Sequence, residues 1–160
     1  MHDPFSVFDL EPQIELDEDQ LERRFLELSR DTHPALVHAV DSPENVDRLM
    51  RSAEVNDAWR ILKDRWSRAR AALESREPGV IGRTSKLPPD LLMEVMEQQE
   101  AAAMAAPEAQ PKLLQRAEAA LKSSWEALLD HFRHGDFTAA AVQVHLAQYH
   151  SRTIERLTKA

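Results

Sequence analysis

The chain has 160 residues, which is enough for one domain of ordinary size or two small ones. It contains no cysteine, which excludes disulfides, thiolate metal sites and cysteine nucleophiles, and its three glycines and 6% aromatic residues are typical of an all-helical protein. Its net charge is −8, and it has no basic cluster that would favour nucleic-acid binding. It also lacks an apolar stretch of about 18 residues, the length that a membrane-spanning helix requires.

Three helix starts are predicted in the first half of the chain. Each start has a side chain that can cap a helix, followed by an apolar pattern: Asp3, Asp17 and Ser42. Two of them are followed by a proline at the first helical position, Pro4 and Pro43. The third helix is expected to bend near residue 64 and to end at Pro78-Gly79. The second helix carries three apolar residues at i, i+4 and i+7, which share one face: Leu21, Phe25 and Leu28.

The connection between the second and third predicted helices contains His33-Pro34-Ala35. Pro34 cannot continue a helix and favours an extended conformation at the residue before it, so His33 is expected where the second helix ends. This connection spans about residues 31–42, and connections of that length between helices often carry function. Taken alone, His33-Pro34 is also compatible with a simple helix stop that bears a surface histidine.

A linker is predicted at residues 78–89, where glycine and proline are frequent. It divides an N-terminal domain, residues 1–77, from a C-terminal domain, residues 90–160. The C-terminal domain shows three amphipathic helical patterns with short connections, which indicate an antiparallel three-helix bundle. Gly135 suits the position just past the end of the second of these helices.

Two stretches of sequence match known patterns. Along the N-terminal domain, these residues follow one another in a set order around His33-Pro34: Leu21, Arg24, Phe25, Leu28, Arg30, Asn56, Ala58, Trp59, Leu62, Asp64, Arg68 and Ala69. This order resembles a J domain, the co-chaperone module that docks on Hsp70. The stretch Pro89–Glu97, with the sequence PDLLMEVME, resembles the start of the C-terminal bundle of the HscB/Hsc20 co-chaperones of iron–sulfur cluster assembly. The combination is much more specific than the His-Pro pair alone.

This resemblance implies an all-α, L-shaped, cytoplasmic adaptor without enzymatic activity. It would deliver an iron–sulfur scaffold protein (IscU-like) to a specialised Hsp70-type chaperone (HscA-like) and stimulate ATP hydrolysis, which promotes cluster transfer. The implied Hsp70-binding residues are Arg23, Arg24, Arg30, His33, Pro34 and Ala35. The implied scaffold-binding residues are Leu92, Met93, Met96, Glu97, Glu100 and Tyr149.

Ala35 departs from the family motif, which is His-Pro-Asp. The missing carboxylate is expected to accept charge-assisted hydrogen bonds from the chaperone, which a methyl group cannot do. Losing one partner of a buried interface pair costs about 2–5 kcal/mol, and about 1.4 kcal/mol is already a tenfold effect. The helix before the motif, usually basic, has a net charge of −2 over residues 18–31. We therefore expect weak or absent stimulation of Hsp70.

Each candidate surface also has a structural alternative. The three arginines are equally compatible with a solvated helix face that pairs with acids one turn away. Leu92, Met93 and Met96 could be ordinary bundle core, and Tyr149 a core tyrosine; if exposed, they would form a partner patch, to which adaptable methionine is well suited. The alternative function is a J-like interaction protein that binds a client but no longer stimulates Hsp70.

The histidines raise the possibility of a metal site. His131 and His134 are spaced i, i+3, and His145 and His150 follow nearby in sequence. Two loosely spaced imidazoles without cysteine or an HExxH motif make a nonspecific site, and the sequence lacks phosphate-loop and nucleophile motifs. We therefore predict no metal, no cofactor and no catalysis by this chain, and assign any iron–sulfur cluster to its partner.

Overall fold

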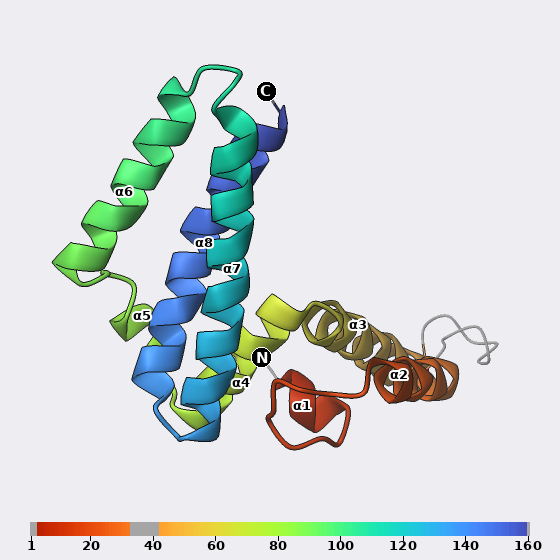
Figure 1. Ribbon diagram of the computed structural model, residues 1–160. Coiled ribbons are helices and arrows are strands. Elements are labelled where there is room, and N and C mark those ends of the chain that lie inside the picture. The colour runs from red at the N-terminus through yellow and green to blue at the C-terminus, as the bar shows by residue number, and fades with distance from the viewer. Residues whose placement is uncertain (1–2, 33–41, 160) are drawn as a thin grey trace. The chain divides into compact units, whose positions relative to one another are not determined.

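The computed structural model describes residues 3–32 and 42–159, in which every regular element is a helix (Figure 1). The all-α prediction is confirmed for these ranges, and none of their helices combines the length and apolar character that a membrane crossing requires. The helices are α1 (Pro4–Val7), α2 (Glu18–Thr32), α3 (Pro43–Lys63), α4 (Arg65–Arg76), α5 (Val80–Arg83), α6 (Pro89–Met104), α7 (Gln110–Arg133) and α8 (Phe137–Lys159).

The helices form two compact units, Met1–Arg76 and Glu77–Ala160. Segment 78–89, where the sequence indicated a linker, is packed within the second unit. Its apolar side chains Val80, Ile81 and Leu87 are buried, and their burial stabilises the short helix α5 despite the neighbouring glycines and prolines. The L-shaped arrangement of the two units stays a prediction.

The capping side chains predicted from the sequence occupy the starts of three helices. Asp3 Oδ1 accepts a hydrogen bond from the Phe5 amide at 2.8 Å, and Ser42 Oγ accepts one from the Asn45 amide at 3.1 Å. Asp17 Oδ1 accepts from two first-turn amides of α2 at 3.0 and 3.3 Å. These bonds satisfy amide groups that have no partner within their own helix, which is why each helix begins where the sequence indicated.

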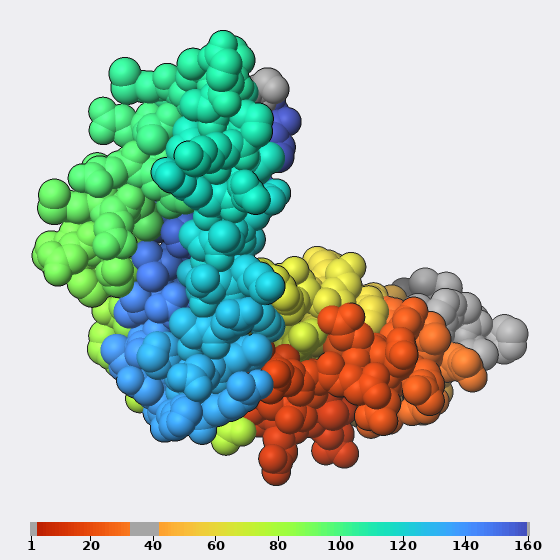
Figure 2. All heavy atoms as spheres, viewed as in Figure 1, coloured from red at the N-terminus to blue at the C-terminus, as the bar shows by residue number. Residues whose placement is uncertain are grey.

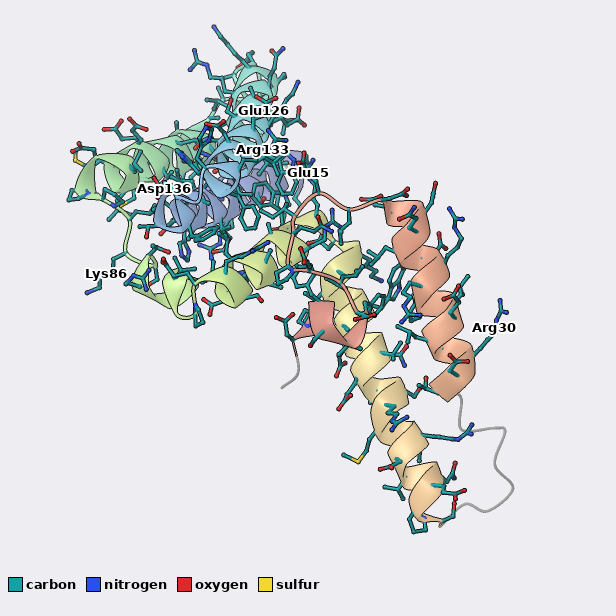
Figure 3. All side chains as sticks on the ribbon, turned by 90° about the horizontal axis from the view of Figure 1, so that it is seen from below. Glu15, Arg30, Lys86, Glu126, Arg133 and Asp136 are labelled. Atoms are coloured by element: carbon teal, nitrogen blue, oxygen red, sulfur yellow. The ribbon has the colours of Figure 1, made fainter. Side chains whose placement is uncertain are left out.

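An aromatic stack in the first unit is centred on Trp59 of α3, which is half-buried. Its ring is stacked on Phe25 of α2, with centroids 4.6 Å apart, and on Phe8, which follows α1, at 6.5 Å. Leu21 is buried and Leu28 half-buried on the same face of α2, as the helical spacing predicted. The helices α2 and α3 therefore pack face to face, and Figure 3 shows them running antiparallel.

A buried arginine fixes the bend between α3 and α4. The side chain of Arg68 is only 4% exposed; its Nε donates to the carbonyl of Ile14 at 2.6 Å and its Nη1 to the carbonyl of Leu62 at 2.7 Å. These charge-assisted bonds join the segment before α2 to the end of α3. The bend predicted near residue 64 is thus confirmed and has a structural anchor.

The central helix of the second unit is α8, on which α5, α6 and α7 all pack. Figure 2 shows α8 between α6 and α7. The α7–α8 turn is closed by Gly135 at φ +76°, where the amides of Gly135 and Asp136 donate to the carbonyls of Phe132 and His131 at 3.1 and 2.9 Å. These bonds end α7 next to Gly135, as the sequence predicted. The turn reverses the direction of the chain, so α7 and α8 run antiparallel.

Candidate functional site

The candidate Hsp70-binding residues divide into two groups. His33, Pro34 and Ala35 lie outside the described residues. The arginines belong to α2, where Arg24 Nη1 lies 3.4 Å from Glu27 Oε2 and its Nε donates to the Phe8 carbonyl at 3.5 Å. Arg24 is therefore partly engaged within its own unit.

The other two arginines of α2 are exposed to solvent. Arg23 and Arg30 are seven residues apart, so they lie on the same side of the helix. Arg23 Nε donates to the Asp19 carbonyl at 3.4 Å, and Figure 3 shows Arg30 extending from α2 away from α3. Of the three arginines, these two present their charge on the side of α2 that faces water.

Two of the candidate scaffold-binding residues are half-buried in the second unit. Leu92 of α6 and Tyr149 of α8 both pack against the buried cluster of Leu87, Val95 and Leu146. They hold α6 against α8, so the core interpretation applies to them in part. Both side chains remain partly exposed.

The methionines of α6 are exposed rather than part of the core. Met93 is 62% exposed, Met96 57% and Met104 78%. Helical spacing places them along one side of α6, a surface that we call the methionine stripe, with the exposed Glu97 and Glu100 beside it. An exposed row of large apolar side chains with an acidic border is typical of a protein-binding surface.

Sequence reasoning missed the basic side of this surface. Arg152 and Arg156 of α8 line a pocket of about 370 Å³ whose opposite wall is formed by Glu100, Ala102 and Ala103 of α6. The Arg152 guanidinium lies 5.5 Å from the centre of the Tyr149 ring, a cation–π contact. The i, i+3 and i, i+4 spacings of these residues were visible in the sequence, but the approach of α6 was not.

A buried polar contact holds α6 and α8 together beside the pocket. His150 is 9% exposed, and its Nδ1 donates to Gln98 Oε1 at 3.0 Å. Burial disfavours the charged imidazolium and lowers the pKa of His150 below its ordinary value of about 6.5. The histidine therefore stabilises this helix contact in its neutral form.

Acidification should weaken the second unit through His150. In the unfolded chain the imidazole binds a proton near pH 6.5, whereas in the folded chain it does so only at lower pH, so stability is lost as the pH falls below about 6.5. Each unit by which the pKa is lowered corresponds to about 1.4 kcal/mol. The free energy of unfolding, measured with urea, should fall less from about pH 7 to about pH 5 in the His150→Gln variant than in the unaltered chain. An equal loss in both proteins would contradict this assignment.

Two of the histidines that were considered as metal ligands, His134 and His145, hydrogen-bond to backbone carbonyls. His145 Nε2 donates to the Ile81 carbonyl at 2.9 Å, which ties α5 to α8, and His134 Nδ1 lies 2.7 Å from the Asp130 carbonyl. Within residues 3–32 and 42–159 no three potential metal-ligating side chains converge. His145 and His150 therefore make interhelical contacts, and His134 makes a contact at the end of α7.

Comparisons with known proteins give a consistent picture. The profile of the HSCB C-terminal oligomerisation domain family matches residues 87–158. The co-chaperone protein HscB homolog of Haemophilus ducreyi is 36% identical over 99 residues, which are 61% of this chain and 57% of that protein. The iron–sulfur cluster co-chaperone protein HscB homolog of Arabidopsis thaliana is 28% identical over 158 residues, 98% of this chain and 63% of that protein. The chain thus spans about 60% of the length of these two relatives.

The fold has a close counterpart among solved structures. The crystal structure of human co-chaperone protein HscB superposes with a TM-score of 0.82 and 24% sequence identity, over 99% of this chain and 82% of that one. At that identity the likeness shows the fold alone. It nevertheless agrees with the all-helical architecture that the sequence predicted.

Proposed function

We propose that this chain is a member of the HscB co-chaperone family and acts as a non-enzymatic adaptor that presents an iron–sulfur scaffold protein (IscU-like) to a specialised Hsp70-type chaperone (HscA-like). The observation that carries this proposal is the exposed methionine stripe on α6, in the part of the chain that the family profile matches. The cytoplasmic location expected from the sequence belongs to the same proposal.

The scaffold would bind across the border between α6 and α8. Met93 and Met96 supply apolar surface that becomes buried only in the complex, and methionine adapts its shape at little energetic cost. The exposed parts of Leu92 and Tyr149 extend that surface toward α8, while Glu97 and Glu100 supply carboxylates for basic groups of the scaffold. Such a site holds a protein surface in place without changing it chemically.

The first unit would bring the complex to the chaperone. Arg23 and Arg30 offer two exposed positive charges on α2, next in sequence to His33-Pro34-Ala35. With Ala35 at the acidic position of the motif, stimulation of ATP hydrolysis by Hsp70 is impaired. The adaptor then binds its scaffold normally but promotes cluster transfer poorly.

Ala35 also favours a second candidate function. A J-like protein without the motif carboxylate could hold its client without driving the chaperone cycle. In that case the stripe on α6 would still bind the client, and Hsp70 would not respond even when the carboxylate is restored.

A two-partner binding experiment tests the proposal. The full chain is immobilised and exposed to the cognate scaffold protein and the cognate Hsp70, separately and together, while ATP hydrolysis is measured in parallel. The proposal predicts capture of the scaffold, with little stimulation of hydrolysis. Failure to capture the scaffold at about 100 μM, where even weak functional complexes form, would refute it.

A further inference from the structure

The pocket between the C-terminal halves of α6 and α8 is unlike the rest of the candidate scaffold surface, because one wall of it is basic. Arg152 and Arg156 form that wall, and Thr153 lies between them. The opposite wall, from α6, carries Glu100. A pocket of about 370 Å³ separates the two walls, which leaves room for side chains of another protein.

The two arginines are arranged to act together. They are one helical turn apart on α8, so their guanidinium groups project from the same face and can converge on one carboxylate. Stacking on Tyr149 restricts the motion of Arg152, which reduces the entropy that it would lose on binding.

No carboxylate neutralises the positive charge of this pair inside the described part of the fold. Lys159, farther along α8, is held by Glu155 at 2.7 Å. Among the described residues, Arg152 and Arg156 make no such ion pair with a carboxylate. In a chain with a net charge of −8, an open pair of arginines in a pocket is an electrostatic feature that an acidic partner group would complement.

The pocket is continuous with the surface already proposed to bind the scaffold. Tyr149, Arg152 and Arg156 lie on one face of α8, over about 10 Å of helix. Glu100 borders both the pocket and the methionine stripe of α6. A protein seated on the stripe would therefore cover the pocket as well.

We propose that Arg152 and Arg156 form a second, electrostatic part of the scaffold-binding surface and bind an aspartate or glutamate side chain of the same protein that covers the methionine stripe. This inference rests on the proposed function and adds to it the charge of the partner group. The apolar stripe supplies most of the affinity. The arginine pair fixes the register of the partner along α6 and α8 and speeds association.

Calorimetric titration of the full-length chain with the cognate scaffold protein tests the inference. The double variant R152Q/R156Q should bind about tenfold more weakly, and R152E/R156E about a hundredfold more weakly. R152K/R156K should bind with an affinity between those of the unaltered chain and R152Q/R156Q, because lysine keeps the charge but lacks the planar guanidinium that stacks on Tyr149. Raising the salt from about 50 to about 300 mM should weaken binding by the unaltered chain more than binding by R152Q/R156Q.

The chain offers a matched control on α7. Lys112 and Arg116 are also basic, exposed and one turn apart, and neither lines the pocket, so K112Q/R116Q makes the same change in net charge outside it. This control should bind the scaffold within about twofold of the unaltered chain. Circular dichroism of each variant shows whether the helices are intact.

Each outcome separates this inference from the proposed function. If the unaltered chain binds the scaffold and R152Q/R156Q binds equally well, the arginine pair has no such role and the proposed function stands. If the unaltered chain does not bind the scaffold, both the proposed function and this inference are refuted. A role in binding inorganic phosphate, or a second copy of this chain, would appear as loss of that binding in R152Q/R156Q with scaffold affinity unchanged, and would also overturn the inference.

Discussion

Replacing Ala35 by Asp should increase stimulation of the cognate Hsp70 ATPase at least about tenfold over the unaltered chain. The aspartate restores a carboxylate that can accept charge-assisted hydrogen bonds from the chaperone. Losing one partner of a charged pair in a buried interface costs about 2–5 kcal/mol, which exceeds the roughly 1.4 kcal/mol needed for a tenfold change. Single-turnover ATP hydrolysis, measured with saturating scaffold protein, gives the effect directly.

A matched control separates this effect from a general increase in negative charge. Ala119 is exposed on α7, so Ala119→Asp adds the same charge in the second unit and should leave stimulation unchanged. Full stimulation by the unaltered chain would show that Ala35 does not impair the motif. No stimulation by Ala35→Asp, with scaffold binding intact, would favour the J-like interaction protein instead.

The second large effect is expected at the methionine stripe. Changing Met93 and Met96 together to Ser should weaken scaffold binding at least about a hundredfold, because burying each methionine in the complex is worth about 1.5–3 kcal/mol. These side chains are 62% and 57% exposed in the free protein, so the free energy of unfolding should change by less than about 0.5 kcal/mol for each. Calorimetric titration and urea unfolding measure the two quantities separately.

Two further variants make this result specific. Met50 is 61% exposed on α3, so Met50→Ser removes the same kind of surface from the first unit and should leave scaffold affinity unchanged. Leu92→Ala should reduce both stability and binding, because Leu92 packs against the core cluster as well as bordering the stripe. Equal scaffold affinity for the Met93/Met96 variant and the unaltered chain would refute the assignment of the stripe.

Local signals in the sequence were sufficient for most helix boundaries. Asp3, Asp17 and Ser42 cap helices because their side chains bond to amides within the same turn, and Gly135 ends α7 because it adopts a left-handed conformation. The region 78–89 was harder to interpret. Its glycines and prolines indicate a linker, but Val80 and Ile81 are buried in the second unit, and their burial depends on α8, far along the chain.

The candidate site was only partly predictable for the same reason. Leu92 and Met96 are one turn apart on α6, yet Leu92 packs on the core cluster and Met96 is exposed, because the position of α8 decides which side of α6 is covered. The pair of Gln98 and His150 and the pocket with Arg152 also join residues about fifty positions apart. Helical spacing shows which residues share a face of α6, whereas the contact between α6 and α8 decides whether that face is buried or exposed.

The most direct measurement is an amide NMR titration of the labelled full-length chain with the unlabelled cognate scaffold protein. The account predicts that shift changes concentrate along residues 93–104 of α6 and 149–156 of α8, with little change on the exposed side of α7. Changes confined to the first unit, or spread over α7 while the methionine stripe is unaffected, would contradict it.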